Sequence, residues 1–299
     1  MVKEYKIGNI ILFRENIASA DQLRTLCADL QTLIRSETGH DAFIMIDQEG
    51  GAVTRLPESC INVPGSMALA ATGDPENTYL AGKLTGEELR SLGVNFNLAP
   101  SVDVNCNPAN PIIGVRSYGD TPATVAKYAA GMIRGLQDGG VLCLAKHFPG
   151  HGDTAEDSHT ALAVTYKTQE ELASCELLPF GADTGLHAVM VGHIAAPNVT
   201  GSDTPATLSP QLVAMIPNAE DTLIITDSLA MDAIADAYTP GEAAVLALQA
   251  GCDVLLMPNS LSEAYAAVLE AVQNGTITQE RLDQSVNKIL RYKEVFTHV

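Results

Sequence analysis

The chain has 299 residues, of which 46% are hydrophobic, enough to bury a sizeable core. Its 36 acidic residues outnumber its 17 basic ones, which gives a formal net charge of −19. Nucleic acids and anionic membrane surfaces attract basic patches, so this excess of acid argues against both as partners. No apolar run approaches the length that crosses a bilayer, and no linker divides the chain, so we expect one domain over residues 1–299.

Six cysteines are spread along the chain, and no two of them form a C-x-x-C pair. Several lie in apolar runs, which is typical of reduced thiols in the core of an intracellular protein. The first ten residues also lack the apolar stretch of a signal peptide. We therefore predict a cytoplasmic protein whose core thiols are Cys27, Cys60, Cys106, Cys143, Cys175 and Cys252.

Short apolar segments alternate with helical patterns along the whole chain. This alternation indicates a parallel sheet, and the segments are apolar without a period of two, as expected when both faces are covered. Helices are predicted between the segments, for example over 19–35, 74–93 and 121–139, each preceded by a capping residue. The seven predicted strands are 8–13, 42–47, 94–104, 141–145, 188–192, 222–226 and 253–257.

Polar residues gather where these strands end: Asp47, Lys146, His147, His193 and Asp227. In a TIM-type (β/α) barrel the carboxyl ends of all strands meet at one mouth, where the active site lies. An open doubly wound sheet is the alternative, but it would bring together only residues near its switch point. Neither a dinucleotide fingerprint nor a phosphate-binding loop occurs, so we expect no cofactor.

The stretch 146–159, KHFPGHGDTAEDSH, follows the fourth strand and holds three histidines in a glycine-rich loop. Asp157 lies two residues before His159, so its carboxylate can accept one ring N–H and leave the other ring nitrogen for proton transfer. The alternatives are a loop of backbone-bonded histidines and a zinc site made by His147, His151, Asp153 and His159. Because their spacing matches no compact metal motif, we predict no metal.

At these residues the chain resembles the glycoside hydrolase family 3 barrels, and within them the bacterial β-N-acetylglucosaminidases. The resemblance extends from about residue 8 to the C-terminus. It is carried by IDQEGGAVTR (46–55), RSYGD (116–120), the 146–159 loop and TDSLAM (226–231), which occur in the family's order. The two-domain β-glucosidases of the family lack the D-S-H loop, so the resemblance favours N-acetylglucosamine over glucose.

The resemblance also implies roles for individual residues. Asp227 matches the nucleophile, and His159 matches the acid/base, oriented by Asp157. Met231 belongs to the nucleophile's motif, and His193 is expected to line the pocket or to be a plain core histidine. Without the resemblance, Asp227 also fits a helix N-cap. The residues that match groups holding the sugar hydroxyls and the nucleophile are Asp47, Arg55, Arg116, Lys146 and His147.

The implied activity is that of a retaining exo-β-N-acetylglucosaminidase acting on cell-wall (muropeptide) fragments, a small-molecule carbohydrate substrate. A histidine suits the role of acid because its unperturbed pKa of about 6.5 lies near neutral pH. The alternatives are a non-catalytic sugar-binding protein on a decayed barrel, a metal-dependent barrel hydrolase, and an N-acetylglucosaminide phosphorylase or β-glucosidase of the same family.

A complete barrel of this type has eight strands, and we count seven. Only seven residues precede the first, so the barrel is expected to lack the family's first strand and to begin one β/α unit late. An opening would then lie between strands 8–13 and 253–257, with unpaired edges on both sides. We expect this opening to be loose or to be filled by a neighbouring chain, which would make an oligomer.

Overall fold

The computed structural model describes residues 1–154, 161–181 and 185–297, and it has the predicted α/β architecture. One parallel sheet has the order β1 (Asn9–Leu12), β2 (Phe43–Ile46), β3 (Phe96–Asn97) and β4 (Leu142–Cys143). A second has the order β5 (Ala145–Phe148), β7 (Ala188–Val191) and β9 (Leu223–Thr226).

The two sheets form one continuous curved wall. Only Leu144 separates β4 from β5, and a parallel bridge between Ser101 and Lys146 joins the sheets. A further parallel bridge, between Ile225 and Val254, places the seventh segment beside β9. All seven predicted strand segments are therefore present and parallel, the last of them as a single bridge.

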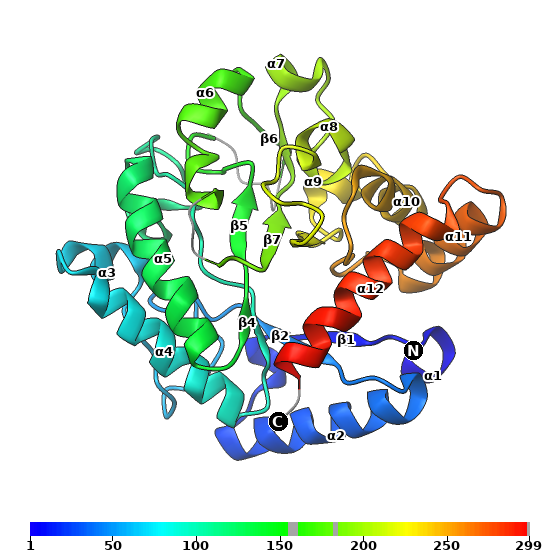
Figure 1. The fold of residues 1–299 in the computed structure, drawn as a ribbon, viewed down its shortest axis with the longest axis horizontal. Helices are drawn as coiled ribbons and strands as arrows, with labels where there is room; N and C mark the ends of the chain where they lie inside the picture. Colours follow the sequence, from blue (N-terminus) through cyan, green and yellow to red (C-terminus); the bar gives the residue numbers. More distant parts are fainter. Residues whose placement is uncertain (155–160, 182–184, 298–299) are drawn as a thin grey trace.

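Helices surround this wall (Figure 1). The α-helices are α1 (Val2–Tyr5), α2 (Ala20–Thr38), α3 (Ser66–Ala71), α4 (Pro75–Ser91), α5 (Pro122–Asp138), α6 (Gln169–Ser174), α7 (Pro197–Thr200), α8 (Pro210–Val213), α9 (Asp232–Ala235), α10 (Pro240–Ala250), α11 (Leu261–Gln273) and α12 (Gln279–Phe296). The short 3₁₀ turns are η1 (Arg14–Asn16), η2 (Gly114–Arg116), η3 (Leu178–Phe180) and η4 (Ala206–Leu208). A small additional sheet pairs β6 (Ala163–Val164) with β8 (Ile194–Ala195).

Side chains on the strands alternate between an inner and an outer core. On β2, Phe43 and Met45 join a cluster inside the barrel, whereas Ile44 and Ile46 pack outward with the surrounding helices. This is the alternation expected of a strand covered on both faces. The polar strand ends are thus held on a rigid wall with two apolar layers.

Helix α12 closes the end of the barrel opposite the carboxyl ends of the strands. Tyr292 and Phe296 belong to the inner cluster, and the Lys293 ammonium donates to the carbonyl of Gly8 at 2.8 Å, just before β1. The Lys288 ammonium donates to the carbonyl of Thr222, just before β9. Figure 1 shows α12 returning across the molecule toward β1 and β2.

No strand fills the opening expected in the barrel, because among the described residues none pairs with both β1 and the segment at Val254. A neighbouring chain in this opening stays a prediction. The inner-core residues of α12 enter from the end of the barrel, where the helix contacts the backbone before β1 and β9. A helical pattern in the sequence does not tell which surface such a helix covers.

We expect Phe296→Ala to lower the free energy of unfolding by about 3–5 kcal/mol, because it removes a large inner-core side chain. Val295 is the matched control, since it precedes Phe296 on the same helix and is 65% exposed. Urea unfolding of both variants measures the effect. An unchanged midpoint for Phe296→Ala would show that α12 does not contribute to closing the barrel.

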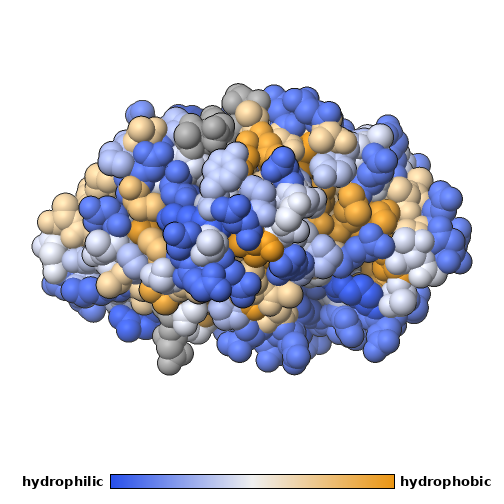
Figure 2. All heavy atoms as spheres, turned by 90° about the horizontal axis from the view of Figure 1, so that it is seen from above, coloured by the Kyte–Doolittle hydropathy of each residue, from blue (hydrophilic) through white to orange (hydrophobic). Residues whose placement is uncertain are grey.

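The surface in Figure 2 is mainly polar, with apolar residues in separate patches among the charged ones. Association with a second chain remains a prediction. No helix in the described ranges is both long and apolar enough to span a membrane. The prediction of six core thiols was only half right, because Cys106 is exposed and two others are partly exposed; the buried ones are Cys27, Cys143 and Cys252.

Candidate active site

A cavity of about 360 Å³ lies at the carboxyl ends of the strands. In a barrel these ends converge, so residues far apart in the sequence meet there. Seven of the predicted site residues line the cavity, namely Asp47, Arg55, Arg116, Lys146, His147, Asp227 and Met231.

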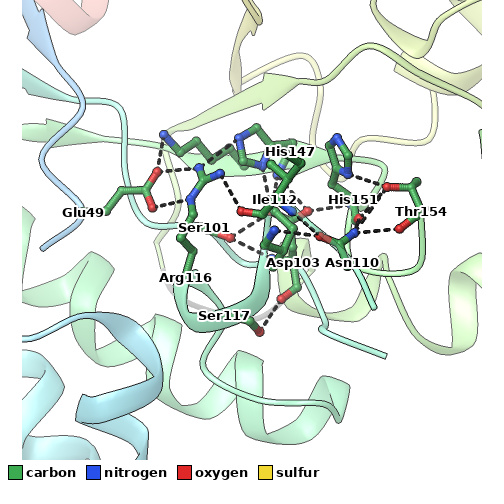
Figure 3. A network of polar contacts seen from close by, with 12 residues as sticks. Glu49, Ser101, Asp103, Asn110, Ile112, Arg116, Ser117, His147, His151 and Thr154 are labelled. Atoms are coloured by element: carbon green, nitrogen blue, oxygen red, sulfur yellow. Dashed lines mark hydrogen bonds and ion pairs between the residues drawn. The ribbon is translucent and has the colours of Figure 1, made fainter. Parts of the chain in front are cut away.

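Two basic and two acidic side chains form one ion-pair network on a wall of this cavity. The Arg116 guanidinium binds Glu49 through two hydrogen bonds of 2.7 and 2.9 Å. The Lys146 ammonium lies 2.7 Å from the Glu49 carboxylate and 2.8 Å from that of Asp47. Figure 3 shows Glu49 and Arg116 facing one another beside His147. Lys146 is thereby held between two carboxylates.

Electrostatics keep Glu49, Arg116 and Lys146 charged. Burial alone raises the pKa of Glu49, but the positive charges of Lys146 and Arg116 outweigh it and lower that pKa far below the usual range. Burial lowers the pKa of Lys146, yet Asp47 and Glu49 raise it above its usual value. The site therefore presents fixed charges and hydrogen-bond donors to any ligand in the cavity.

Asp103, at the end of the third strand segment, positions two histidines. Its carboxylate accepts the Nδ1–H of His147 at 2.7 Å and the backbone N–H of His151 at 2.7 Å. Burial raises the pKa of Asp103, but the nearby His147 more than offsets this and lowers it. With Nδ1 protonated, Nε2 of His147 accepts from Arg116, 3.5 Å away (Figure 3). The imidazole is thus fixed in one tautomer.

Asp227 follows β9 and lies partly exposed in the cavity. Its Oδ1 accepts the backbone N–H of Ser228 at 2.7 Å. Burial raises its pKa, but the nearby imidazoles of His193 and His147 and this N–H outweigh burial and lower it below the usual Asp range. The carboxylate therefore stays ionised at neutral pH, as a nucleophile requires.

Asp227 is not a helix cap, which was the alternative for this residue. The next helix, α9, begins at Asp232, with Met231 at its N-cap and no side-chain capping bond. The carboxylate instead lies one residue beyond a barrel strand and faces the cavity. Its position is that of a functional group.

Arg55 supplies a donor that no described residue pairs with. Its Nε is buried and makes no hydrogen bond with the residues that the structure describes. Buried donors are normally paired, so an unpaired one in a cavity wall is suited to an acceptor atom on a ligand. Met231 and Met257 add apolar surface to the same cavity.

His193 is not among the residues that line the cavity. Of the two expectations for it, a pocket residue or a plain core histidine, the structure agrees with the second. Its ring is fully buried, with Nδ1 2.8 Å from the Thr207 hydroxyl and Nε2 2.8 Å from the Ser228 carbonyl. Since a carbonyl only accepts, Nε2 must donate. Through this bond to Ser228 the ring holds the backbone next to Asp227 in place, as a core histidine would.

Asp157 and His159 lie outside the described residues, so their predicted roles stay predictions. The start of their loop is described and packs closely. Gly152 allows this, because a Cβ there would lie 1.8 Å from the Val104 carbonyl oxygen. Asp153, a member of the alternative zinc site, instead accepts from the Thr165 hydroxyl at 2.8 Å.

The profile of the Glycosyl hydrolase family 3 N terminal domain matches residues 1–292. The chain belongs to this family. It is 35% identical to a beta-hexosaminidase A of Pseudoalteromonas piscicida, with 98% of the chain and 54% of that relative aligned. A beta-hexosaminidase of Methylococcus capsulatus is also 35% identical, over 90% of the chain and 80% of its own length.

Solved structures agree with this assignment and with the barrel. A glycoside hydrolase family 3 beta-N-acetylglucosaminidase from Paenibacillus sp. str. FPU-7 superimposes with a TM-score of 0.95 at 44% identity. The alignment covers 98% of this chain and 57% of that one. The chain thus spans little more than half the length of this structure and of the Pseudoalteromonas relative.

Two residues of this family 3 site, Glu49 and Asp103, were missed from the sequence, and His151 was considered only as a possible zinc ligand. Glu49 lies in the DQEGG motif and His151 in the 146–159 loop, so both were inside stretches already singled out. Asp103 ends the third strand segment, and its position at a strand end was the available signal. What the sequence does not reveal is which basic group each carboxylate pairs with.

We expect Glu49→Gln to lower the free energy of unfolding by about 3–5 kcal/mol, because it leaves Arg116 and Lys146 buried with too little negative charge. Glu87→Gln is the control, since Glu87 forms only an exposed pair with Lys83 at 3.9 Å. Chemical denaturation at several pH values measures both.

The pH dependence of this effect has a definite sign. The folded-state pKa of Glu49 is lowered, so its stabilisation is present above the unfolded pKa of about 4.3 and is lost as pH falls toward the folded value. The stability difference between wild type and Glu49→Gln should therefore shrink below about pH 4.3. A difference that stays constant down to pH 3 would contradict the ion-pair explanation.

Proposed function

We propose that this chain is the catalytic domain of a retaining exo-β-N-acetylglucosaminidase. The observation that carries the proposal is an ionised carboxylate, Asp227, at a barrel strand end, facing a cavity lined by fixed donors and charges. The β-hexosaminidase and β-N-acetylglucosaminidase relatives support the reaction class.

In the proposed reaction, Asp227 attacks the anomeric carbon of a terminal β-linked N-acetylglucosamine and forms a covalent glycosyl-enzyme. His159, oriented by Asp157, donates a proton to the departing oxygen. The same imidazole then takes a proton from water, which hydrolyses the intermediate. Two inversions at one carbon give net retention of configuration.

The other cavity residues suit the holding of a sugar. Asp47 and Glu49 accept hydrogen bonds from hydroxyl groups, while Lys146, Arg116 and the unpaired Nε of Arg55 donate. Charged groups make stronger hydrogen bonds than neutral ones, which helps a site with few aromatic side chains. Met231 and Met257 would contact the apolar parts of the sugar.

A panel of aryl β-glycosides tests the reaction with the full chain. We expect release of the aryl group from the N-acetylglucosaminide, little release from the glucoside, and the β-anomer as the first product by NMR. Phosphate should not be needed. Formation of a sugar 1-phosphate would make the protein a phosphorylase, preference for the glucoside would make it a β-glucosidase, and no release would favour a non-catalytic barrel.

The natural substrate is proposed to be a cell-wall fragment that ends in N-acetylglucosamine, processed in the cytoplasm. The chemistry requires only a terminal β-linked N-acetylglucosamine. It does not define the rest of the fragment, which the experiment below identifies. Chromatography of a muropeptide mixture before and after incubation should show release of free N-acetylglucosamine from its termini. Cell fractionation with an antibody tests the location.

A further inference from the structure

A second cluster of reactive side chains lies outside the cavity. One ligand atom each of Cys106, Cys175 and Glu176 lie within 4.8 Å of one another. Cys106 is exposed and Cys175 partly exposed, whereas Glu176 is only 1% exposed. The cluster thus leads from the surface to a buried carboxylate, and its two thiols come from segments about 70 residues apart.

Glu176 has hydrogen-bonding capacity that the described residues leave unused. Its Oε1 accepts from the Cys106 thiol at 3.4 Å and forms an ion pair with Lys167. Its Oε2 is buried and has no hydrogen-bond partner among the described residues. The same holds for Oδ1 of Asp153, which lies beside the cluster. Buried carboxylate oxygens are normally paired, so these two oxygens are suited to contact a cation or a water bound to it.

The charge of the cluster is also unbalanced. Within the part of the chain that the structure describes, Lys167 is the cation that faces it, with its ammonium 3.6 Å from the Asp153 carboxylate and 3.6 Å from the Cys106 sulfur. This one positive charge serves both Asp153 and Glu176. The Lys167 side chain is 26% exposed, so it has a path to solvent if another cation takes its place. The ammonium lies where a metal ion would bind.

We propose that Cys106, Cys175 and Glu176 bind a structural Zn²⁺ ion, with a water as fourth ligand held by Asp153. Two sulfur ligands and one carboxylate suit zinc better than magnesium or calcium, which prefer oxygen alone. Zn–S bonds of about 2.3 Å and Zn–O bonds of about 2.1 Å require the ligand atoms to move inward by roughly 1 Å. Each thiol releases its proton to solvent, and Lys167 turns outward with its proton retained.

The site would join segments that support the start of the 146–159 loop. Cys106 follows the third strand segment, and Glu176 packs against Gly150, where a Cβ would lie 2.6 Å from the Glu176 Cβ. The backbone N–H of Asn107 donates to the carbonyl of Gly152 at 3.1 Å. A metal ion here fixes these contacts but does not enter the catalytic cavity.

Cobalt provides a direct spectroscopic test. The chain is freed of metal with a chelator, kept under a phosphine reductant and titrated with Co²⁺. We expect one equivalent to produce a near-ultraviolet thiolate-to-cobalt charge-transfer band, which Zn²⁺ then removes. Co²⁺ that binds without this band would sit on imidazole or carboxylate ligands and would overturn the proposal, as would the absence of binding.

The zinc affinity of cysteine variants tests which residues bind the ion. Competition with a chromophoric zinc chelator should show at least a tenfold weaker affinity for Cys106→Ser and for Cys175→Ser. Cys60→Ser should match wild type, because Cys60 is a partly exposed thiol outside the cluster. Circular dichroism confirms that each variant is folded. Zinc affinity that survives in the Cys106→Ser, Cys175→Ser double variant would place the ion elsewhere and sink the proposal.

A variant of Lys167 should strengthen zinc binding, whereas the cysteine variants weaken it. Lys167→Gln removes the competing ammonium, so Zn²⁺ should bind more tightly than in wild type, whereas Glu176→Gln should weaken binding. A cluster that was only an ion pair would give neither result. Equal affinities for wild type and Lys167→Gln would contradict the placement of the ion at the ammonium position.

Discussion

Replacing Asp227 by Ala should abolish turnover of an aryl N-acetylglucosaminide while the fold survives. The variant cannot form the covalent glycosyl-enzyme. Removing the nucleophile of an enzyme that works through a covalent intermediate costs on the order of 10⁶-fold in kcat. Asp227 makes few structural contacts, chiefly with the neighbouring Ser228 N–H, so little stability is lost with it. Single-turnover kinetics and thermal unfolding of the same preparation measure both quantities.

Added azide identifies the cause of the loss. In Asp227→Ala, azide can attack the sugar in place of the carboxylate, and a single inversion gives the α-glycosyl azide. Asp236→Ala is the control, since Asp236 is an exposed carboxylate nine residues further on. Near wild-type turnover in a folded Asp227→Ala protein, or recovery of the β-azide, would remove Asp227 from the role of nucleophile.

Much of the fold and of the cavity could be predicted, because the ends of buried parallel strands can be recognised in the sequence. Buried parallel strands are apolar throughout, so the first polar residue after each one marks the mouth of the barrel. This logic placed Asp47, Lys146, His147 and Asp227 together correctly, and all four line the cavity. Arg116 and Arg55 were located by motif rather than by pattern.

Pairings within the site could not be predicted in the same way. Asp47 and Glu49 lie two residues apart after the same strand, yet only Glu49 binds Arg116 through both oxygens, 67 residues away. Likewise, His193 follows β7 and His147 lies near the end of the neighbouring β5, but the His193 ring turns away from the cavity to Thr207 and Ser228. Side-chain direction after a strand depends on loop geometry, which strand periodicity does not encode.

Helix α12 shows the same limit at the level of the fold, because a helical pattern does not tell which surface the helix covers. The location of Tyr292 and Phe296 in the inner core of the barrel depends on contacts of α12 with Gly8 and with the segments before β9, which lie far away in the sequence. Tertiary context therefore decided both the pairings in the site and the position of α12.

His159→Ala should show a loss that depends on the leaving group. General acid catalysis contributes roughly 10²–10⁴-fold, and a good leaving group such as nitrophenolate needs little of it for bond cleavage. We therefore expect a loss of this size on an N-acetylglucosaminyl disaccharide and a much smaller one on the nitrophenyl substrate. Steady-state kinetics on both substrates measure the difference, and Asp157→Ala should show a milder version of it.

Azide again distinguishes the roles, because His159→Ala keeps Asp227. The glycosyl-enzyme still forms, and azide attacks it without needing a general base, so the product is the β-glycosyl azide after two inversions. His40→Ala is the matched control, since His40 is exposed and lies between α2 and β2. Equal losses on the disaccharide and the nitrophenyl substrate, without azide product, would mean that His159 is not the acid/base. If so, His151 is the first of the described residues at the cavity to test as the acid. Burial and the neighbouring His147 lower its pKa, so a smaller fraction of it is protonated at neutral pH than of an unperturbed imidazole. A wild-type rate that falls with rising pH well below pH 6.5 would point to His151.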